Sequence, residues 1–278
     1  MRVSVIGCGH LGIPHAAAMA ELGHEVIGVD VDQAKVDRLN AGQCPIYETR
    51  LPELLAAHTA SGRLRFTTDI REAADFADLH FIGTGTPINA DGRSYDTAQV
   101  YGAVRQLAPL LTRPCTIVGK STVTVGTTAQ VTALAQRLAP AGQDVDVVWN
   151  PEFLREGHAV QDTLRPDRLI AGITTAEGEK AIRAVYAPIL DAGAPIFVTD
   201  PRRAPRWVWS NTRPPDPPGV NTSPLTAQAG GSRSRRPSGY PLSACEVANP
   251  PGAPGTPGAP NAPAVPSRFG LVGLRERV

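Results

Sequence analysis

The sequence predicts an α/β fold over residues 1–200, with a doubly wound and mostly parallel sheet, followed by a disordered Pro/Gly/Arg-rich tail over residues 201–278. Three observations lead to this division. Short apolar runs alternate with Ala/Leu-rich stretches of helical length, a glycine-rich turn follows the first run, and the composition changes abruptly at residue 201. Alternating strands and helices produce a parallel sheet that is covered on both faces.

The first two strands and the helix between them form a βαβ opening. A strand at Arg2–Ile6 leads through a glycine turn into an Ala-rich helix that ends near Gly23, and a second strand at Glu25–Val29 ends at Asp30. Further strands are expected at 64–67, 79–83, 116–119, 145–149, 169–171 and 196–198. Helices are expected near 33–41, 50–61, 97–111, 126–139 and 177–190.

The tail differs from the rest of the chain in composition and in charge. It holds 16 of the 27 prolines but only 11 Leu, Val and Phe residues, with no Ile or Met, which is too little apolar material to offset chain entropy. Its 10 Arg and 3 acidic residues give a charge of +7, whereas residues 1–200 carry 17 basic and 23 acidic residues, or −6. Most of the arginines are scattered among Pro and Gly rather than interleaved with aromatic residues, so we expect no nucleic-acid partner.

The cysteines and the apolar runs exclude several classes of protein. Cys8, Cys44, Cys115 and Cys245 include no close-spaced pair, so neither a metal site nor a disulfide framework is expected. No signal peptide precedes Val3, and no apolar run reaches the roughly 18 residues of a membrane span. The sequence therefore predicts a cytoplasmic protein without a membrane partner.

A glycine fingerprint lies at residues 7–12 (GCGHLG), between the first strand and the first helix. In a Rossmann-like fold this spacing uses Gly7 for a tight turn, Gly9 for close approach to a pyrophosphate and Gly12 for packing of helix on strand. Asp30 follows 18 residues after Gly12, where a carboxylate accepts hydrogen bonds from a ribose and repels a 2′-phosphate. The pattern predicts NAD as the cofactor, and the alternative is a glycine-rich turn in a domain that binds no ligand.

Two further loops follow predicted strands and therefore point to the same crevice. Residues 83–87 (GTGTP) consist of small residues that let backbone pass close to the nicotinamide ribose, or they form an ordinary turn. In residues 120–127 (KSTVTVGT) a threonine can orient a water or the nicotinamide amide. The alternative is a plain helix cap by Thr122 or Thr127.

Two carboxylates lie four residues apart in the segment 150–157 (NPEFLREG). Glu152 and Glu156 either share one helical face or flank one pocket, with one of them acting as an acid/base group. The alternative is a capped helix with a solvated glutamate pair and a surface ion pair between Arg155 and Glu156.

Taken together, GCGHLG, GTGTP, KSTVTVGT and NPEFLREG with PDR at 166–168 resemble the UDP-glucose/GDP-mannose dehydrogenase family, most closely its bacterial UDP-glucose 6-dehydrogenases. The four motifs occur in order over residues 1–200. The resemblance implies an NAD-dependent nucleotide-sugar 6-dehydrogenase, which oxidises the sugar C6 alcohol of UDP-glucose twice. UDP-glucuronate then forms through a cysteine-bound thiohemiacetal and thioester.

The resemblance also implies roles for individual residues. The cofactor-binding residues are Gly7, Gly9, Gly12, Asp30, Thr86, Thr122 and Glu156. Glu152 is the catalytic acid/base that helps to hydrolyse the thioester. Phe153, Leu154 and Arg155 line the nucleotide-sugar pocket. Thr124 stands where the family usually has Pro, which removes no functional group.

The chain departs from the family after residue 200. The family continues with a central helix that carries a catalytic Lys and Asn, a glycine-rich loop with the nucleophilic Cys, and a second sugar-binding domain. The lysines of this chain are Lys35, Lys120 and Lys180, and Cys245 lacks neighbouring glycines, so neither catalytic residue is carried over. We therefore predict a truncated chain that is inactive or nearly so and that lacks the family's dimer interface.

Other interpretations of the same sequence remain open. One is a free-standing NAD-binding or regulatory module without catalysis, with the tail as an interaction arm. Another is an unstable product whose exposed apolar face leads to aggregation. The composition of the tail is also typical of GC-rich DNA translated in a shifted frame, which is a hypothesis for the abrupt change at Pro201.

Overall fold

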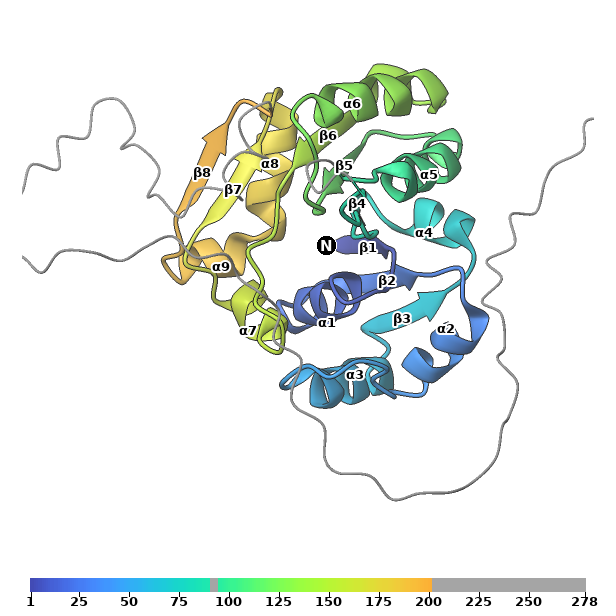
Figure 1. The fold of residues 1–278 in the computed structure, drawn as a ribbon, viewed down its shortest axis with the longest axis vertical. Helices are drawn as coiled ribbons and strands as arrows, with labels where there is room; N and C mark the ends of the chain where they lie inside the picture. The colour runs from blue at the N-terminus through green and yellow to red at the C-terminus, as the bar shows by residue number, and fades with distance from the viewer. Residues whose placement is uncertain (91–94, 202–278) are drawn as a thin grey trace, which may run out of the picture. The chain divides into compact units, whose positions relative to one another are not determined.

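The structure is a computed structural model, and it describes residues 1–90 and 95–201. The predicted disordered tail over residues 201–278 lies outside the described residues, apart from Pro201. The described part is drawn in colour in Figure 1. None of its helices is long and apolar enough to cross a membrane.

The described residues alternate between strands and helices along the chain. The strands are β1 (Arg2–Ile6), β2 (Glu25–Val29), β3 (Leu64–Thr67), β4 (Leu79–Ile82), β5 (Cys115–Gly119), β6 (Val145–Trp149), β7 (Leu169–Gly172) and β8 (Ile196–Thr199). The helices are α1 (Gly12–Glu21), α2 (Gln33–Asn40), α3 (Leu51–Ala60), α4 (Ile70–Phe76), α5 (Ala98–Leu107), α6 (Thr127–Leu138), α7 (Ala159–Leu164), α8 (Ala176–Val185) and α9 (Ala187–Asp191). Short 3-10 helices lie at Ala108–Leu110 and Gly142–Asp144.

The strands form one sheet in the order β3-β2-β1-β4-β5-β6-β7-β8 (Figure 1). The strands β1 to β6 are parallel to one another, β7 meets β6 antiparallel at the pair Trp149–Gly172, and β8 is parallel to β7. The prediction of a doubly wound, mostly parallel sheet is therefore confirmed. The order reverses between β1 and β4, and such sheets bind ligands in the crevice outside the carboxyl ends of these strands.

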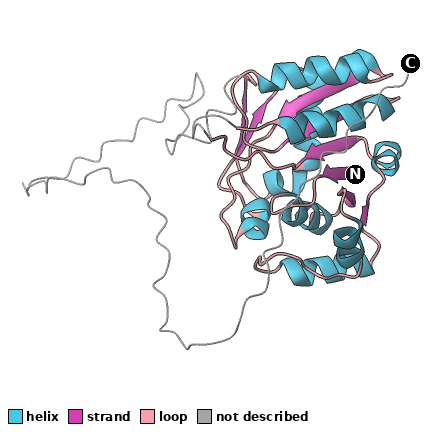
Figure 2. Cartoon of the chain, turned by 45° about the vertical axis from the view of Figure 1, so that its right-hand side comes forward, coloured by secondary structure: helices cyan, strands magenta, loops and turns pink. Residues whose placement is uncertain are grey.

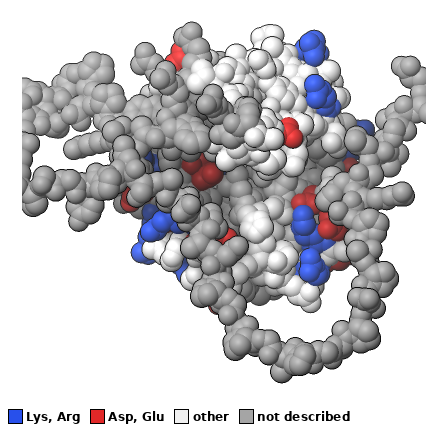
Figure 3. Space-filling model, in the orientation of Figure 1, with Lys and Arg blue, Asp and Glu red and all other residues white. Residues whose placement is uncertain are grey.

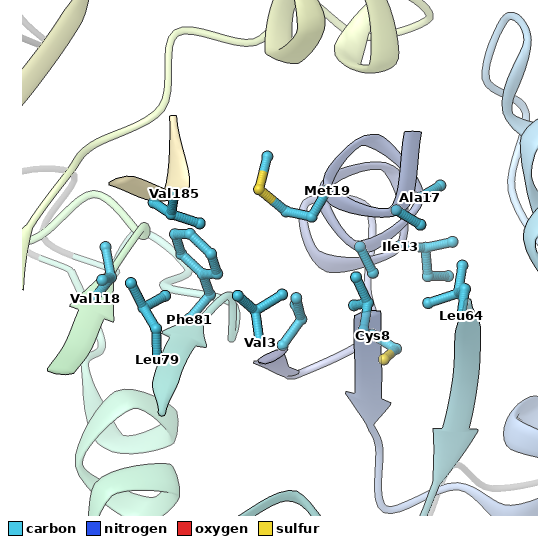
Figure 4. Packing of buried hydrophobic residues seen from close by; sticks show 14 of the residues in the cluster. Val3, Cys8, Ile13, Ala17, Met19, Leu64, Leu79, Phe81, Val118 and Val185 are labelled. Atoms are coloured by element: carbon cyan, nitrogen blue, oxygen red, sulfur yellow. The ribbon is translucent and has the colours of Figure 1, made fainter. Parts of the chain in front are cut away.

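Helices cover both faces of the sheet (Figures 1 and 2). Buried side chains of α4, α5 and α6 form one apolar cluster, and those of α1, α3, α7 and α8 form the other. Figure 4 shows the second cluster, in which Met19 of α1 and Val185 of α8 lie over the strands that carry Val3 and Phe81. Strands that are buried on both faces have continuous apolar sequences, because neither face needs polar residues. For this reason the strand positions predicted from the sequence lie close to those in the structure.

Charged side chains are interspersed on the surface. On the part of the face in Figure 3 that the undescribed residues leave visible, basic and acidic groups lie side by side, without a continuous basic area. Several of them form exposed ion pairs, such as Arg113 with Asp78 and Arg183 with Glu179. Exposed pairs of this kind contribute little to stability, about 0–1 kcal/mol each.

Two short helices lie where the sequence predicts none. The helix α4 begins after Asp69, whose side chain accepts a hydrogen bond from the backbone N–H of Arg71, and Glu72 follows in its first turn. These residues are a helix start signal, but the helix has only seven residues, too few for an apolar period to stand out. The helix α7 has six residues and no capping side chain.

The predicted helix at 177–190 is instead two helices, α8 and α9, which meet at Tyr186. The reason is Pro188, which has no backbone N–H to donate to the preceding turn and stands in the first turn of α9. Tyr186 lies at this break, and its side chain is buried.

We predict that Arg50→Gly stabilises the protein by about 0.5–1 kcal/mol. Arg50 precedes α3 with φ 66°, and it is the non-glycine residue that the described chain places in the left-handed region. Its side chain is exposed, so little packing is lost. Urea denaturation measures the effect, and Arg50→Ala is the control because it removes the side chain and keeps the unfavourable φ. Equal stability of the glycine and alanine variants would show that φ is not the cause.

Candidate functional site

The glycine loop between β1 and α1 has a shape that two of its three glycines dictate. Gly7 has φ 96°, and a Cβ atom there would lie 2.9 Å from the Thr84 side chain. A Cβ atom at Gly12 would lie 1.8 Å from the carbonyl oxygen of Gly7. At Gly9 a Cβ atom would meet no atom within 4 Å, so packing of the chain does not require glycine there. This open position leaves room for phosphates against the backbone at the start of α1.

The carboxylate of Asp30 is fixed at the end of β2. Its oxygens accept hydrogen bonds from the backbone N–H groups of Cys8 and Asp32, each at 3.1 Å. The Lys35 ammonium lies 2.9 Å from Asp30 Oδ2. Lys35 was not predicted from the sequence, although its place in the first turn of the helix after Asp30 is a usable signal. Together these residues place a carboxylate and an ammonium beside the glycine loop, where ribose hydroxyls need an acceptor and a donor.

The loop after β4 approaches the glycine loop, and the loop after β5 contacts the loop after β4. A Cβ atom at Gly83 would lie 3.4 Å from Gly12 Cα, so the β4 loop approaches the start of α1 closely. The hydroxyl of Ser121 donates a hydrogen bond to the carbonyl oxygen of Thr84. The carboxyl ends of three strands therefore meet in one crevice, as the strand order requires.

Thr86 and Thr122 are half-buried in these two loops. The helix-cap alternative for Thr122 and Thr127 is wrong, because the residue that precedes α6 is Gly126 and no side chain caps this helix. Thr127 is the first residue of α6, and its hydroxyl lies 3.2 Å from that of Thr124. Thr122 is consequently not part of a helix end.

The segment 150–157 is a loop, and α7 starts only at Ala159. The alternative in which Glu152 and Glu156 share a helical face is therefore wrong. Glu152 is half-buried, and its Oε2 accepts a hydrogen bond of 2.7 Å from the backbone N–H of Leu154. Glu156 is exposed.

Arg155 and Arg168 hold this loop in two different ways. Arg155 forms an ion pair with Asp162, with 2.6 Å between Nη2 and Oδ1, so the expected surface pair with Glu156 is wrong. This pair lowers the pKa of Asp162 and raises that of Arg155. The guanidinium of Arg168 lies 5.0 Å from the ring centre of Phe153, a cation–π contact.

A cavity of about 490 Å³ lies between this loop and the segment that follows it. Glu152 lines it together with Phe153, Leu154 and Arg155, so the predicted acid/base group and the three predicted substrate-binding residues share one cavity. Glu156 is not among its lining residues. The cavity has the volume typical of small-molecule sites.

Lys120, Asn150 and Tyr186 form the buried wall of the cavity, and the sequence analysis assigned none of them a role. Lys120 Nζ donates to Asn150 Oδ1 at 3.1 Å and lies 3.5 Å from the Tyr186 hydroxyl, which itself donates to Asn150 Oδ1 at 2.8 Å. Asn150 Nδ2 donates to the carbonyl oxygen of Ile170. Burial lowers the pKa of Lys120 to about 8, and the negative charge of Glu152 opposes this shift.

The cysteines of the described chain do not line the cavity. Cys8 and Cys115 are buried, and burial raises the pKa of Cys8 and, to about 12, that of Cys115. Cys44 is half-buried, and burial raises its pKa also. All three thiols are therefore protonated at neutral pH, and a protonated thiol is a poor nucleophile.

The sequence signature of the UDP-glucose/GDP-mannose dehydrogenase family, NAD binding domain, matches residues 1–190. The chain belongs to this family. Residues 1–190 are thus an NAD-binding domain, which agrees with the glycine loop and the carboxylate at the end of β2, and the prediction of NAD as the cofactor is confirmed.

Relatives of known function and solved structures agree with this family. The UDP-glucose 6-dehydrogenase of Rhizobium meliloti (strain 1021) is 40% identical over 204 residues, which cover 73% of this chain and 46% of that protein. The UDP-glucose 6-dehydrogenase of Pseudomonas aeruginosa is 41% identical over 194 residues, or 68% of this chain and 42% of that protein.

Two solved structures share the fold. A ternary complex of GDP-mannose dehydrogenase from Pseudomonas aeruginosa superimposes with a TM-score of 0.71 and 32% identity, over 75% of this chain and 48% of that one. The UDP-glucose dehydrogenase of Pyrobaculum islandicum gives a TM-score of 0.69 and 38% identity, over 74% and 48%. The chain therefore matches less than half the length of each of these relatives.

Proposed function

We propose that this chain is the cofactor-binding half of an NAD-dependent nucleotide-sugar 6-dehydrogenase, and that it binds NAD without completing the oxidation. The observation that carries the proposal is the arrangement of the glycine loop and Asp30 at one edge of the sheet. Gly7 and Gly12 shape the loop, and Gly9 leaves space for the pyrophosphate. The Asp30 carboxylate accepts hydrogen bonds from the ribose hydroxyls. Lys35 forms an ion pair with this carboxylate and donates a hydrogen bond to a ribose hydroxyl.

The remaining residues have roles at the reacting end of the cofactor. Bound NAD supplies a hydride acceptor. Thr86 and Thr122, in the loops after β4 and β5, orient the nicotinamide side, and Glu156 contributes a further contact to the cofactor. Glu152 holds or releases a proton at its carboxylate.

The nucleotide sugar occupies the cavity of about 490 Å³. Phe153 and Leu154 supply its apolar wall. Arg155 supplies a charged group at its rim, and the ion pair with Asp162 fixes the orientation of the Arg155 side chain. The described thiols support the proposed inactivity, because oxidation through a thioester needs a thiolate at the sugar carbon. Among the described cysteines, the Sγ atoms of Cys8 and Cys115 are buried away from this cavity and stay protonated.

Calorimetric titration tests the cofactor site. We expect NAD to bind, NADP to bind far more weakly because the Asp30 carboxylate repels a 2′-phosphate, and Asp30→Ala to lower the NAD affinity about tenfold to a hundredfold. Asp37→Ala is the matched control, since Asp37 is an exposed aspartate on α2 that contacts Gln33. Unchanged NAD affinity in Asp30→Ala would contradict the proposed ribose contact.

The same preparations distinguish the second candidate function, a free-standing NAD-binding module. Both candidates predict that UDP-glucose and NAD together give no increase in NADH absorbance, so the affinity for UDP-glucose is what separates them. Steady NADH formation by the purified chain would refute the proposed inactivity, while NAD binding without any affinity for UDP-glucose would favour the module.

A further inference from the structure

Lys120 carries a buried positive charge that no carboxylate of the described chain neutralises by a hydrogen bond. Its side chain lies in the wall of the cavity, and its two partners, Asn150 Oδ1 and the Tyr186 hydroxyl, are neutral. Burying an ammonium without a counter-charge is costly, so such groups normally pair with an anion.

Three titratable groups from different elements face Lys120. Glu152, from the loop after β6, attracts the ammonium, but its Oε2 is already engaged by the Leu154 N–H. His15 of α1 is buried, and both burial and the Lys120 charge lower its pKa well below its ordinary value, so it is neutral at pH 7. Burial raises the pKa of Tyr186, which stays a neutral hydroxyl. The Glu152 charge therefore acts on Lys120 only through space, and no anionic group of the described chain forms a hydrogen bond or an ion pair with the ammonium.

A second cation in the same cavity is also uncommitted. The Nε atom of Arg168 is buried and has no hydrogen-bond partner among the described residues, while its guanidinium lies against the Phe153 ring. Arg155, by contrast, is paired with Asp162. A cavity with two uncommitted cations fits a ligand with two separate anionic groups.

We propose that Lys120 binds a carboxylate of the ligand, so that this cavity selects a nucleotide sugar that carries a carboxylate over the same nucleotide sugar with an alcohol. This inference rests on the proposed nucleotide-sugar ligand. The ammonium has three N–H donors, and Asn150 Oδ1 and the Tyr186 hydroxyl accept two of them. A remaining donor is available to the ligand, and Arg168 is available to its diphosphate.

Calorimetric titrations with UDP-glucuronate and UDP-glucose test the proposal. At pH 7 we expect UDP-glucuronate to bind about tenfold to a hundredfold more tightly, the range for a hydrogen bond between charged groups. In Lys120→Met the two ligands are expected to bind alike, and in Lys120→Arg part of the preference returns. Lys180→Met is the matched control, because it removes one exposed lysine charge, and it is expected to keep the full preference.

The pH dependence gives a readout that a purely structural lysine would not produce. As the pH rises through about 8, Lys120 loses its proton and the affinity for UDP-glucuronate is expected to fall, while the affinity for UDP-glucose stays constant. Equal affinities for both ligands in the unmodified protein, or an unchanged preference in Lys120→Met, would overturn the proposal. Thermal melts check that each variant is folded.

An NAD titration of the same samples separates the two levels of inference. If NAD binds and UDP-glucuronate does not, the role of Lys120 is refuted and the cofactor site stands. If neither NAD nor either nucleotide sugar binds to a folded sample, the proposed function fails and the role of Lys120 fails with it.

Discussion

At pH 5 the protein is expected to be about 3–4 kcal/mol less stable than at pH 7, because His15 and His80 are fully buried and must stay neutral in the folded state. Burial lowers the pKa of His80 from 6.5 to about 4 and that of His15 well below 6.5. The unfolded chain therefore binds more protons below pH 6.5. The contribution of the two neutral histidines to the free energy of unfolding is fully present above this pH. It is lost as the pH falls, until His80 itself titrates near pH 4.

The surroundings of the two histidines explain why neither accepts a proton readily. His80 Nδ1 lies 2.7 Å from the Ser4 hydroxyl, its Nε2 has no hydrogen-bond partner in the described chain, and the positive charge of Arg113 disfavours its protonation. Neither ring nitrogen of His15 has a hydrogen-bond partner in the described chain. Its ring packs edge-on against the Phe81 ring, with 4.3 Å between the ring centroids.

Urea denaturation at pH 5, 6 and 7 measures the loss. His15→Leu is expected to remove about half of it, because leucine fills the site between α1 and Phe81 without a group that titrates. His10→Gln is the control, since His10 is exposed in the glycine loop and its replacement is expected to leave the pH dependence unchanged. A loss of the same size in His15→Leu would show that the acid sensitivity comes from other groups. Most stabilities lie between about 5 and 15 kcal/mol, so the expected loss is a large part of the total.

The strands could be located from the sequence because each is an apolar run that ends at a turn residue. The positions of these runs, such as Arg2–Ile6 for β1 and Val145–Trp149 for β6, depend only on neighbours in sequence. The antiparallel junction between β6 and β7 could not be predicted, because the direction of a strand depends on how the connecting segment crosses the sheet. The short α7 in that connection has no apolar period that would reveal it.

The proximity of the glycine loop to Asp30 could be predicted in the same way, because the glycines and Asp30 are separated by fixed numbers of residues in one βαβ unit. The side chains that form the buried wall of the cavity could not be predicted from the sequence. Lys120, Asn150 and Tyr186 are 30 and 36 residues apart along the chain, and only the pairing of β5 with β6 and the break after α8 bring them together. Glu156 was grouped with Glu152 by spacing alone, whereas in the structure Glu152 lines the cavity and Glu156 does not.

Replacement of Gly12 by alanine is expected to destabilise the protein by about 3 kcal/mol or more, whereas replacement of Gly9 is expected to change stability by less than about 1 kcal/mol. The Cβ atom at position 12 would lie 1.8 Å from the Gly7 carbonyl oxygen, a backbone atom that cannot move without displacing α1 from β1. At position 9 there is no atom within 4 Å of the added Cβ.

For NAD affinity, Gly9→Ala is the variant with the informative effect. In Gly9→Ala the fold is intact, but the methyl group occupies the space through which the pyrophosphate approaches the backbone, so the NAD affinity is expected to fall at least tenfold, about 1.4 kcal/mol. Thermal melts and NAD titrations of both variants measure the contrast. Gly102→Ala is the control, because Gly102 lies inside α5 with no atom near an added Cβ and its replacement is expected to stabilise the helix by about 0.5–1 kcal/mol.

Each outcome of this comparison bears on one property of the loop. A Gly12→Ala protein as stable as the unmodified one would mean that α1 does not start against the Gly7 carbonyl. A Gly9→Ala protein with unchanged NAD affinity would mean that the pyrophosphate does not pass over the open position of the loop. Loss of NAD binding in Gly9→Ala together with an unchanged melt would separate the residue that accommodates the cofactor from the residue that holds the fold, within six residues of one turn.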